Sequence, residues 1–184
     1  MLIAQQKRKE NIAEYLLYMW QVEDLLRACK LDIDIVDRQL VAGFRLDEKQ
    51  HHEVREWYDS LLKMMRLENK KEKGHLQINI NTLIRLNDLH VQLLHDATRF
   101  PEYGAEFYKT LPFIVELRAR QPQDEQCGEL ETCFNALYGT LMLKLQGKAI
   151  TPETQKAIEQ ISHFIGLLAA YFKKDEEQPL FEND

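Results

Sequence analysis

Apolar residues recur at intervals of three and four positions along almost the whole chain, which places them on one face of an α-helix. Most of the seven glycines and five prolines among 184 residues fall between the segments that carry this spacing or at their ends. No strand pattern, glycine-rich phosphate loop or solenoid repeat interrupts it. The sequence therefore predicts an all-α fold, a single-domain bundle of six or seven helices with no sheet.

The length suits one domain, which buries enough surface to fold without disulfides or metal ions. We expect residues 1–173 to form the helical bundle domain. Residues 174–184 are rich in acidic side chains and contain Pro179, so we expect an acidic, partly disordered tail there.

Capping residues and helix breakers set the expected helix ends. Asp32 and Asp47 are N-cap residues, and Thr151 begins the last helix. Pro112 is expected to kink or divide its helix, because proline removes an amide donor. The first four expected helices cover about residues 4–30, 33–42, 48–73 and 76–98. Three further helices are expected to begin near residues 101, 129 and 151.

Glu23 interrupts the otherwise apolar face of the segment YLLYMWQVEDLLR, residues 15–27. On a helical wheel it lies about 20° from Ile12, inside the apolar arc, whereas Asp24 turns away from it. A lone ionised carboxylate is costly in an apolar interior. Glu23 must therefore meet a cation, meet hydrogen-bond donors or become protonated.

Asn87 and His90 lie among the apolar residues of the helix expected at 76–98 when the wheel is counted from Ile80. Their spacing of three stacks the two side chains on one side of the helix. We hypothesise that Glu23, Asn87 and His90 form one buried polar network, with Arg27 closing a salt bridge to Glu23.

Two alternatives to this network remain open at this point. Glu23 pairs with Arg27 or Lys30 near the rim, far from His90, or the polar residues form a functional site. A network that only fixes the register of the helices is the interpretation we favour.

Four residues are weak candidates for metal ligands: Glu23, His90, His95 and Asp96. The adjacent His95 and Asp96 resemble the ligand pair of HD-type metal phosphohydrolases. That pattern also needs an upstream histidine and a distant downstream aspartate at suitable positions, and neither can be assigned in this sequence. The two side chains diverge by about 100° on the wheel.

Other catalytic patterns are missing from the sequence. Glu48 and His51 form one Glu-x-x-His motif, whereas a di-iron bundle needs two. There is no Gly-x-Ser-x-Gly elbow, and no cysteine has a clear base beside it. We therefore expect no cofactor and name no catalytic residue, and an enzyme is the less favoured interpretation.

Charge and composition limit the expected partners and location. A net charge of -6 and a pI near 5.6 argue against nucleic-acid binding. The opening MLIAQQKRKEN has no apolar core for a secretion signal, and the longest uncharged stretch, residues 160–172, is too short to span a membrane. Three cysteines without a CxxC pair indicate reduced thiols in a cytoplasm.

Residues 3–34, IAQQKRKENIAEYLLYMWQVEDLLRACKLDID, resemble the N-terminal signature of an uncharacterised family of all-helical bacterial proteins, a domain of unknown function. The most specific part of the match is the run from Asn11 to Arg27. The resemblance implies an all-helical bacterial cytoplasmic protein. It carries over no activity, cofactor or catalytic residue.

The leading expectation is a non-enzymatic helical interaction module that binds a second copy of itself or another cellular protein. The alternative is a metal-dependent hydrolase or a small-ligand-binding helical bundle. Its polar site in the core would lie around Glu23, Asn87 and His90.

Overall fold

The computed structural model describes residues 2–122 and 126–181, and all regular structure in these residues is helical. The expected all-α class is confirmed. The helices are α1 (Leu2–Glu10), α2 (Ile12–Ala28), α3 (Ile33–Val36), the π-helical turn η1 (Asp37–Val41), α4 (Glu48–Leu67), α5 (Gln77–His95), α6 (Pro101–Ala119), α7 (Glu129–Leu145) and α8 (Pro152–Glu177).

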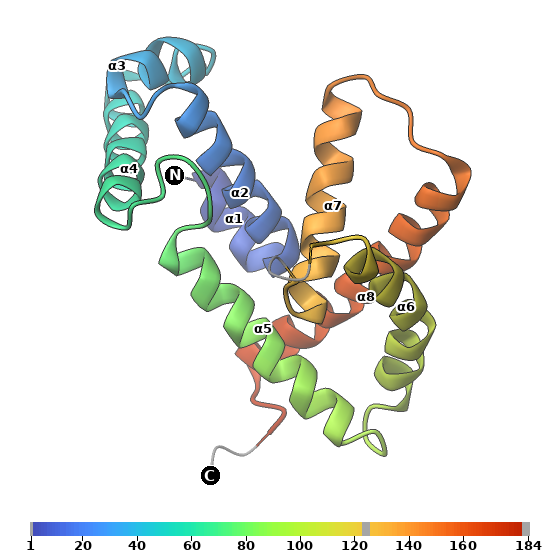
Figure 1. Ribbon diagram of the computed structural model, residues 1–184. Coiled ribbons are helices and arrows are strands. Elements are labelled where there is room, and N and C mark those ends of the chain that lie inside the picture. The colour runs from blue at the N-terminus through green and yellow to red at the C-terminus, as the bar shows by residue number, and fades with distance from the viewer. Residues whose placement is uncertain (1, 123–125, 182–184) are drawn as a thin grey trace.

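Helix α2 lies between two groups of helices (Figure 1). On one side are α1, α3 and α4, on the other α6, α7 and α8, and α5 crosses from one group to the other (Figure 1). Leu16 and Trp20 of α2 belong to the larger apolar core, with residues of α5 to α8. Met19 and Leu26 belong to a smaller core that includes residues of α4. Because α2 is covered on both sides, it is apolar around most of its circumference.

The expected first helix, residues 4–30, is in fact two helices. The chain leaves the helical conformation at Asn11, where φ is -155°. The Asn11 side chain accepts hydrogen bonds from the backbone amides of Ala13 and Glu14, at 2.9 and 3.2 Å. Asparagine is a favoured N-cap residue, so it starts α2 in the middle of a segment whose apolar spacing is continuous.

Helix α6 runs through Pro112 without dividing. Pro112 lies on the exposed side of the helix, next to Tyr108, which is 68% exposed. The Tyr108 carbonyl loses its usual donor four residues later, but water can reach this side of the helix. An interior proline is therefore tolerated there.

The last helix continues beyond residue 173, the expected end of the bundle domain. Helix α8 continues to Glu177, and Arg99 donates a hydrogen bond of 2.9 Å to the carbonyl of Leu180. The ring of Phe181 lies 5.5 Å from that of Phe100. Only residues 182–184 of the expected tail, like residues 123–125 of the expected loop, lie outside the described residues.

None of the helices in the described ranges is both long enough and apolar enough to cross a membrane.

Candidate functional site

The Glu23 carboxylate is fully buried and caps the beginning of α5. Its Oε1 accepts hydrogen bonds from the backbone amide of Leu76, at 2.9 Å, and from Nδ2 of Asn79, at 2.6 Å. Its Oε2 lies 2.6 Å from Nδ1 of His75. The N-cap residue of α5 is Leu76, which has no side chain able to cap. Glu23 therefore supplies an acceptor and a negative charge to this helix start, together with Glu68, whose Oε2 accepts a hydrogen bond of 2.7 Å from the backbone amide of Gln77.

Arg27 does not pair with Glu23 but donates hydrogen bonds to the connection between α4 and α5. Its Nε donates a hydrogen bond of 3.2 Å to the carbonyl of Lys70, and its guanidinium also donates to the carbonyl of Gly74. On α2 it forms an ion pair of 2.7 Å with Asp24. The expected Glu23–Arg27 salt bridge is replaced by these contacts, because the carbonyls of the connection lie within reach of the guanidinium.

His75 is held in a fixed orientation by two neighbours. Its ring stacks on Trp20 at 4.1 Å between centroids, with 13° between the planes, and Glu23 fixes Nδ1. A carboxylate that orients a histidine also occurs in hydrolase triads and around metal sites. Here no nucleophilic side chain of the described residues bonds to the ring, so the pair lacks the third member of a triad.

Two buried polar atoms near His75 have no partner among the described residues, Nε1 of Trp20 and Oδ1 of Asn79. One is a donor and the other an acceptor, so each has the capacity to bind a water molecule. The network around Glu23 is otherwise satisfied.

Asn87 and His90 do not belong to the Glu23 network, and the expected three-residue cluster is corrected accordingly. Asn87 is exposed, and His90, although buried, bonds elsewhere. Val91 lies only about 20° from Ile80 on the helical wheel. It is nevertheless 41% exposed, whereas Leu86 and Leu93 are fully buried. The buried face of α5 is thus rotated away from the direction that Ile80 indicated.

His90 is a neutral histidine of the larger core. Burial lowers its pKa to about 4 and raises the pKa of Tyr103, so both groups are neutral, and a hydrogen bond of 2.6 Å joins His90 Nδ1 and the Tyr103 hydroxyl. The rings of Phe107 and Phe164 lie 5.0 and 5.8 Å from the imidazole. The nearest carboxylate, that of Glu129, is 3.8 Å from Nε2, too far for a hydrogen bond.

The four candidate metal ligands do not come together. Glu23 and His90 belong to different networks, His95 is exposed at the end of α5, and Asp96 pairs with Arg99 at 3.2 Å. Within residues 2–122 and 126–181, no group of three histidine, cysteine, aspartate or glutamate side chains is arranged to hold a metal ion.

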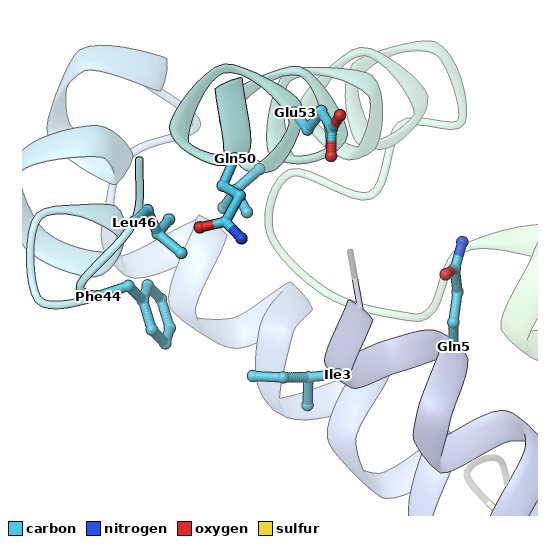
Figure 2. Close-up of a pocket in the computed structure, with 7 residues that line it drawn as sticks. Ile3, Gln5, Phe44, Leu46, Gln50 and Glu53 are labelled. Atoms are coloured by element: carbon cyan, nitrogen blue, oxygen red, sulfur yellow. The ribbon is translucent and has the colours of Figure 1, made fainter. Parts of the chain in front are cut away.

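A cavity of about 220 Å³ lies between α1, the connection that follows η1, and α4. Figure 2 shows Ile3, Phe44 and Leu46 directed toward one space, with the Gln50 amide at its edge. Ligand pockets usually enclose roughly 300 to 1,000 Å³. This cavity is below that range.

The exposed face of α6 carries a continuous line of apolar residues, which we call the α6 stripe. Its members follow one another at intervals of four and three residues, and all are exposed: Pro101, Ala105, Tyr108, Pro112, Val115 and Ala119. Tyr108 and Val115 are 68% and 58% exposed. One edge of the stripe is charged, with Glu102, Lys109 and Glu116 at intervals of seven residues.

The architecture places the protein among all-α helical bundles. Residues 1–179 match the family described as "Domain of unknown function (DUF4924)", and the chain belongs to this family. The resemblance found at residues 3–34 is thereby confirmed and extended along the chain. Comparisons with curated proteins and with solved structures give no match.

Proposed function

We propose that this protein is a non-enzymatic helical interaction module that self-associates through the α6 stripe. The observation that supports this proposal most directly is that six apolar residues form an unbroken line on the exposed face of one helix. Exposed faces of helices in monomeric proteins are normally polar, and a contiguous apolar patch commonly marks a binding surface.

The spacing of the α6 stripe identifies the kind of partner. Intervals of four and three residues average 3.5, the repeat with which one helix packs along another in a coiled coil. Helix α6 lies at the edge of the bundle, on the side opposite α3 and α4 (Figure 1). Its buried side, which includes Phe107 and Ile114, is occupied by the larger core. A partner helix is thus the natural occupant of its outer side.

The alternative function, a hydrolase or a ligand-binding bundle, has no comparable support. Glu23 and His90 bond to different partners, and Asn87 is exposed. The three cysteines are free, which supports a reducing compartment and a cytoplasmic location for the proposed module.

Sedimentation velocity over a range of chain concentrations tests the proposal. We expect a reversible monomer–dimer equilibrium that is lost in Tyr108→Glu and in Val115→Glu, because each variant places a charge on the α6 stripe. Leu67→Glu is the matched control, since Leu67 is 82% exposed at the end of α4. This variant should dimerise normally. A wild-type chain that stays monomeric up to about 1 mM, or a Tyr108→Glu chain that still dimerises, would overturn the proposal.

A further inference from the structure

We propose, building on the proposed function, that the α6 stripe packs against the same stripe of a second copy in antiparallel orientation. In this arrangement a twofold axis relates the copies, and Lys109 of each lies opposite Glu116 of the partner subunit. The size pattern of the stripe, its one charged edge and the extent of its exposed apolar residues support this geometry together.

Small and large residues alternate along the central part of the α6 stripe. Ala105, Pro112 and Ala119 occupy one heptad position, while Tyr108 and Val115 occupy the other. In an antiparallel pair, each layer joins one heptad position with the other. Large side chains then lie on small ones, with Tyr108 on the partner's Ala119. A parallel pair would place Tyr108 on the partner's Tyr108 and leave poorly filled layers between.

The charged edge of the stripe decides the orientation. Glu102, Lys109 and Glu116 line one exposed edge, whereas Gly104, Leu111 and Arg118, which are buried or half-buried, line the other. In an antiparallel pair, like edges face each other, so Lys109 meets the partner's Glu116, and the twofold axis makes this contact twice. In a parallel pair, the charged edge would face Leu111 and Gly104 of the partner subunit and form no ion pair there.

Charge and apolar contact together decide the register. Sliding one helix by a heptad in one direction brings Lys109 opposite the partner's Lys109, which is repulsive. Sliding it two heptads instead pairs Glu102 with the partner's Lys109, but leaves Val115 outside the contact. The proposed register covers both Tyr108 and Val115, the two most exposed large apolar side chains of α6.

The groups required for the contact are available in the free chain. The side chains of Lys109 and Glu116 are 66% and 60% exposed. Their present partners are Glu106 and Arg120 on the same helix. The pair of Glu116 and Arg120 is exposed on both sides and is worth little. Glu106 is buried and also accepts a hydrogen bond from Gln160, so it keeps a partner when Lys109 turns to the second copy. The covered length, from Tyr108 to Ala119, is short, so the buried area lies near or below about 1,000 Å² and the dimer is weak and reversible.

Two charge-reversal variants test the orientation. Lys109→Glu and Glu116→Lys each place like charges across the twofold axis, and we expect each variant alone to dimerise roughly tenfold more weakly than the wild type. An equimolar mixture should recover dimers at nearly wild-type strength, because both contacts in the mixed dimer join opposite charges. The double variant should recover as well. Circular dichroism confirms that each chain is folded.

The matched control reverses an exposed pair on α4, Lys63 and Asp59, which are 2.7 Å apart. Lys63→Glu and Asp59→Lys should dimerise like the wild type, whether alone or mixed. Sedimentation of the mixtures gives the dissociation constants in every case.

The outcomes separate this inference from the proposed function. Charge-reversal variants that dimerise like the wild type, while Tyr108→Glu does not, would overturn the antiparallel contact and leave the α6 stripe as the interface. A mixture that stays as weak as its components would do the same. A wild-type chain that never dimerises would overturn both proposals.

Discussion

The buried carboxylate of Glu23 accepts a hydrogen bond of 2.9 Å from the backbone amide of Leu76, 53 positions further along the chain. This contact joins the middle of α2 to the start of α5, which has no capping side chain of its own. A carboxylate within an apolar helical face is explained by this role, because it satisfies donors that would otherwise be buried without a partner.

Replacing Glu23 should destabilise the fold in proportion to the hydrogen bonds lost. We expect Glu23→Ala to lower the free energy of unfolding by about 3 kcal/mol, since the Leu76 amide and the Asn79 side chain lose their acceptor. Glu23→Gln keeps an acceptor oxygen and should cost only about 1 kcal/mol. Urea denaturation measures both. Glu14→Ala, at an exposed position of α2, is the control, and equal effects at residues 14 and 23 would contradict the capping role.

Removing Arg27 should loosen the connection between α4 and α5 without unfolding the protein. Arg27 donates to the carbonyls of Lys70 and Gly74, so Arg27→Gln leaves residues 68–75 less restrained. We expect trypsin to cleave this connection several-fold faster, at the lysines of the KKEK run, residues 70–73. Arg85→Gln removes an exposed pair between α5 and α8 and is the control. Unchanged cleavage rates would show that Arg27 does not restrain the connection.

The stability of the protein should fall as the pH drops from about 6.5 to about 4, in part because of His90. Burial lowers its folded-state pKa from 6.5 to about 4, so between these values only the unfolded chain takes up the proton. The loss should reach at most about 3 kcal/mol. His90→Gln retains a group able to bond Tyr103 but does not titrate. Thermal denaturation against pH should be flatter for this variant, and parallel curves would contradict the assignment.

Thiol reactivity should differ among the three cysteines. Burial raises the pKa of Cys133 to about 12 and also raises that of Cys29, so neither forms the reactive thiolate near neutral pH. Cys127 is only half-buried. We expect a thiol reagent at pH 8 to modify Cys127 first in the folded protein, and all three residues in denaturant. Rapid modification of Cys133, located by peptide mapping, would contradict the buried position.

Local signals in the sequence predicted the start of most helices. Asp32, Asp47 and Thr151 were identified as caps, and each side chain accepts a hydrogen bond from the first turn of its helix. Asn11 was missed, although it belongs to the same class of residue, because the apolar spacing continues across it. An N-cap residue affects only one helical turn, whereas the apolar spacing extends over many turns. Within a long segment of periodic apolar residues, a cap is therefore easily overlooked.

The partners of the polar residues were not predictable in the same way. Neither His75 nor Asn79 was identified as a partner of Glu23. The one signal in the sequence was that α5 begins without a capping side chain, so that a residue from elsewhere in the chain must accept hydrogen bonds at its start. Asn87 was wrongly placed inward, because a wheel gives relative directions on a helix and not the direction of the core.

The sequence by itself determined that the chain is helical, where most helices begin, and that Glu23 is buried, since these depend on residues within a few turns of one another. Tertiary structure alone decided that Glu23 meets His75, Leu76 and Asn79, because that depends on the rotation of α5 and on the path of residues 68–76. It also decided that the α6 stripe is left uncovered. Which side of a helix is buried is settled by the other helices, and not by the helix itself.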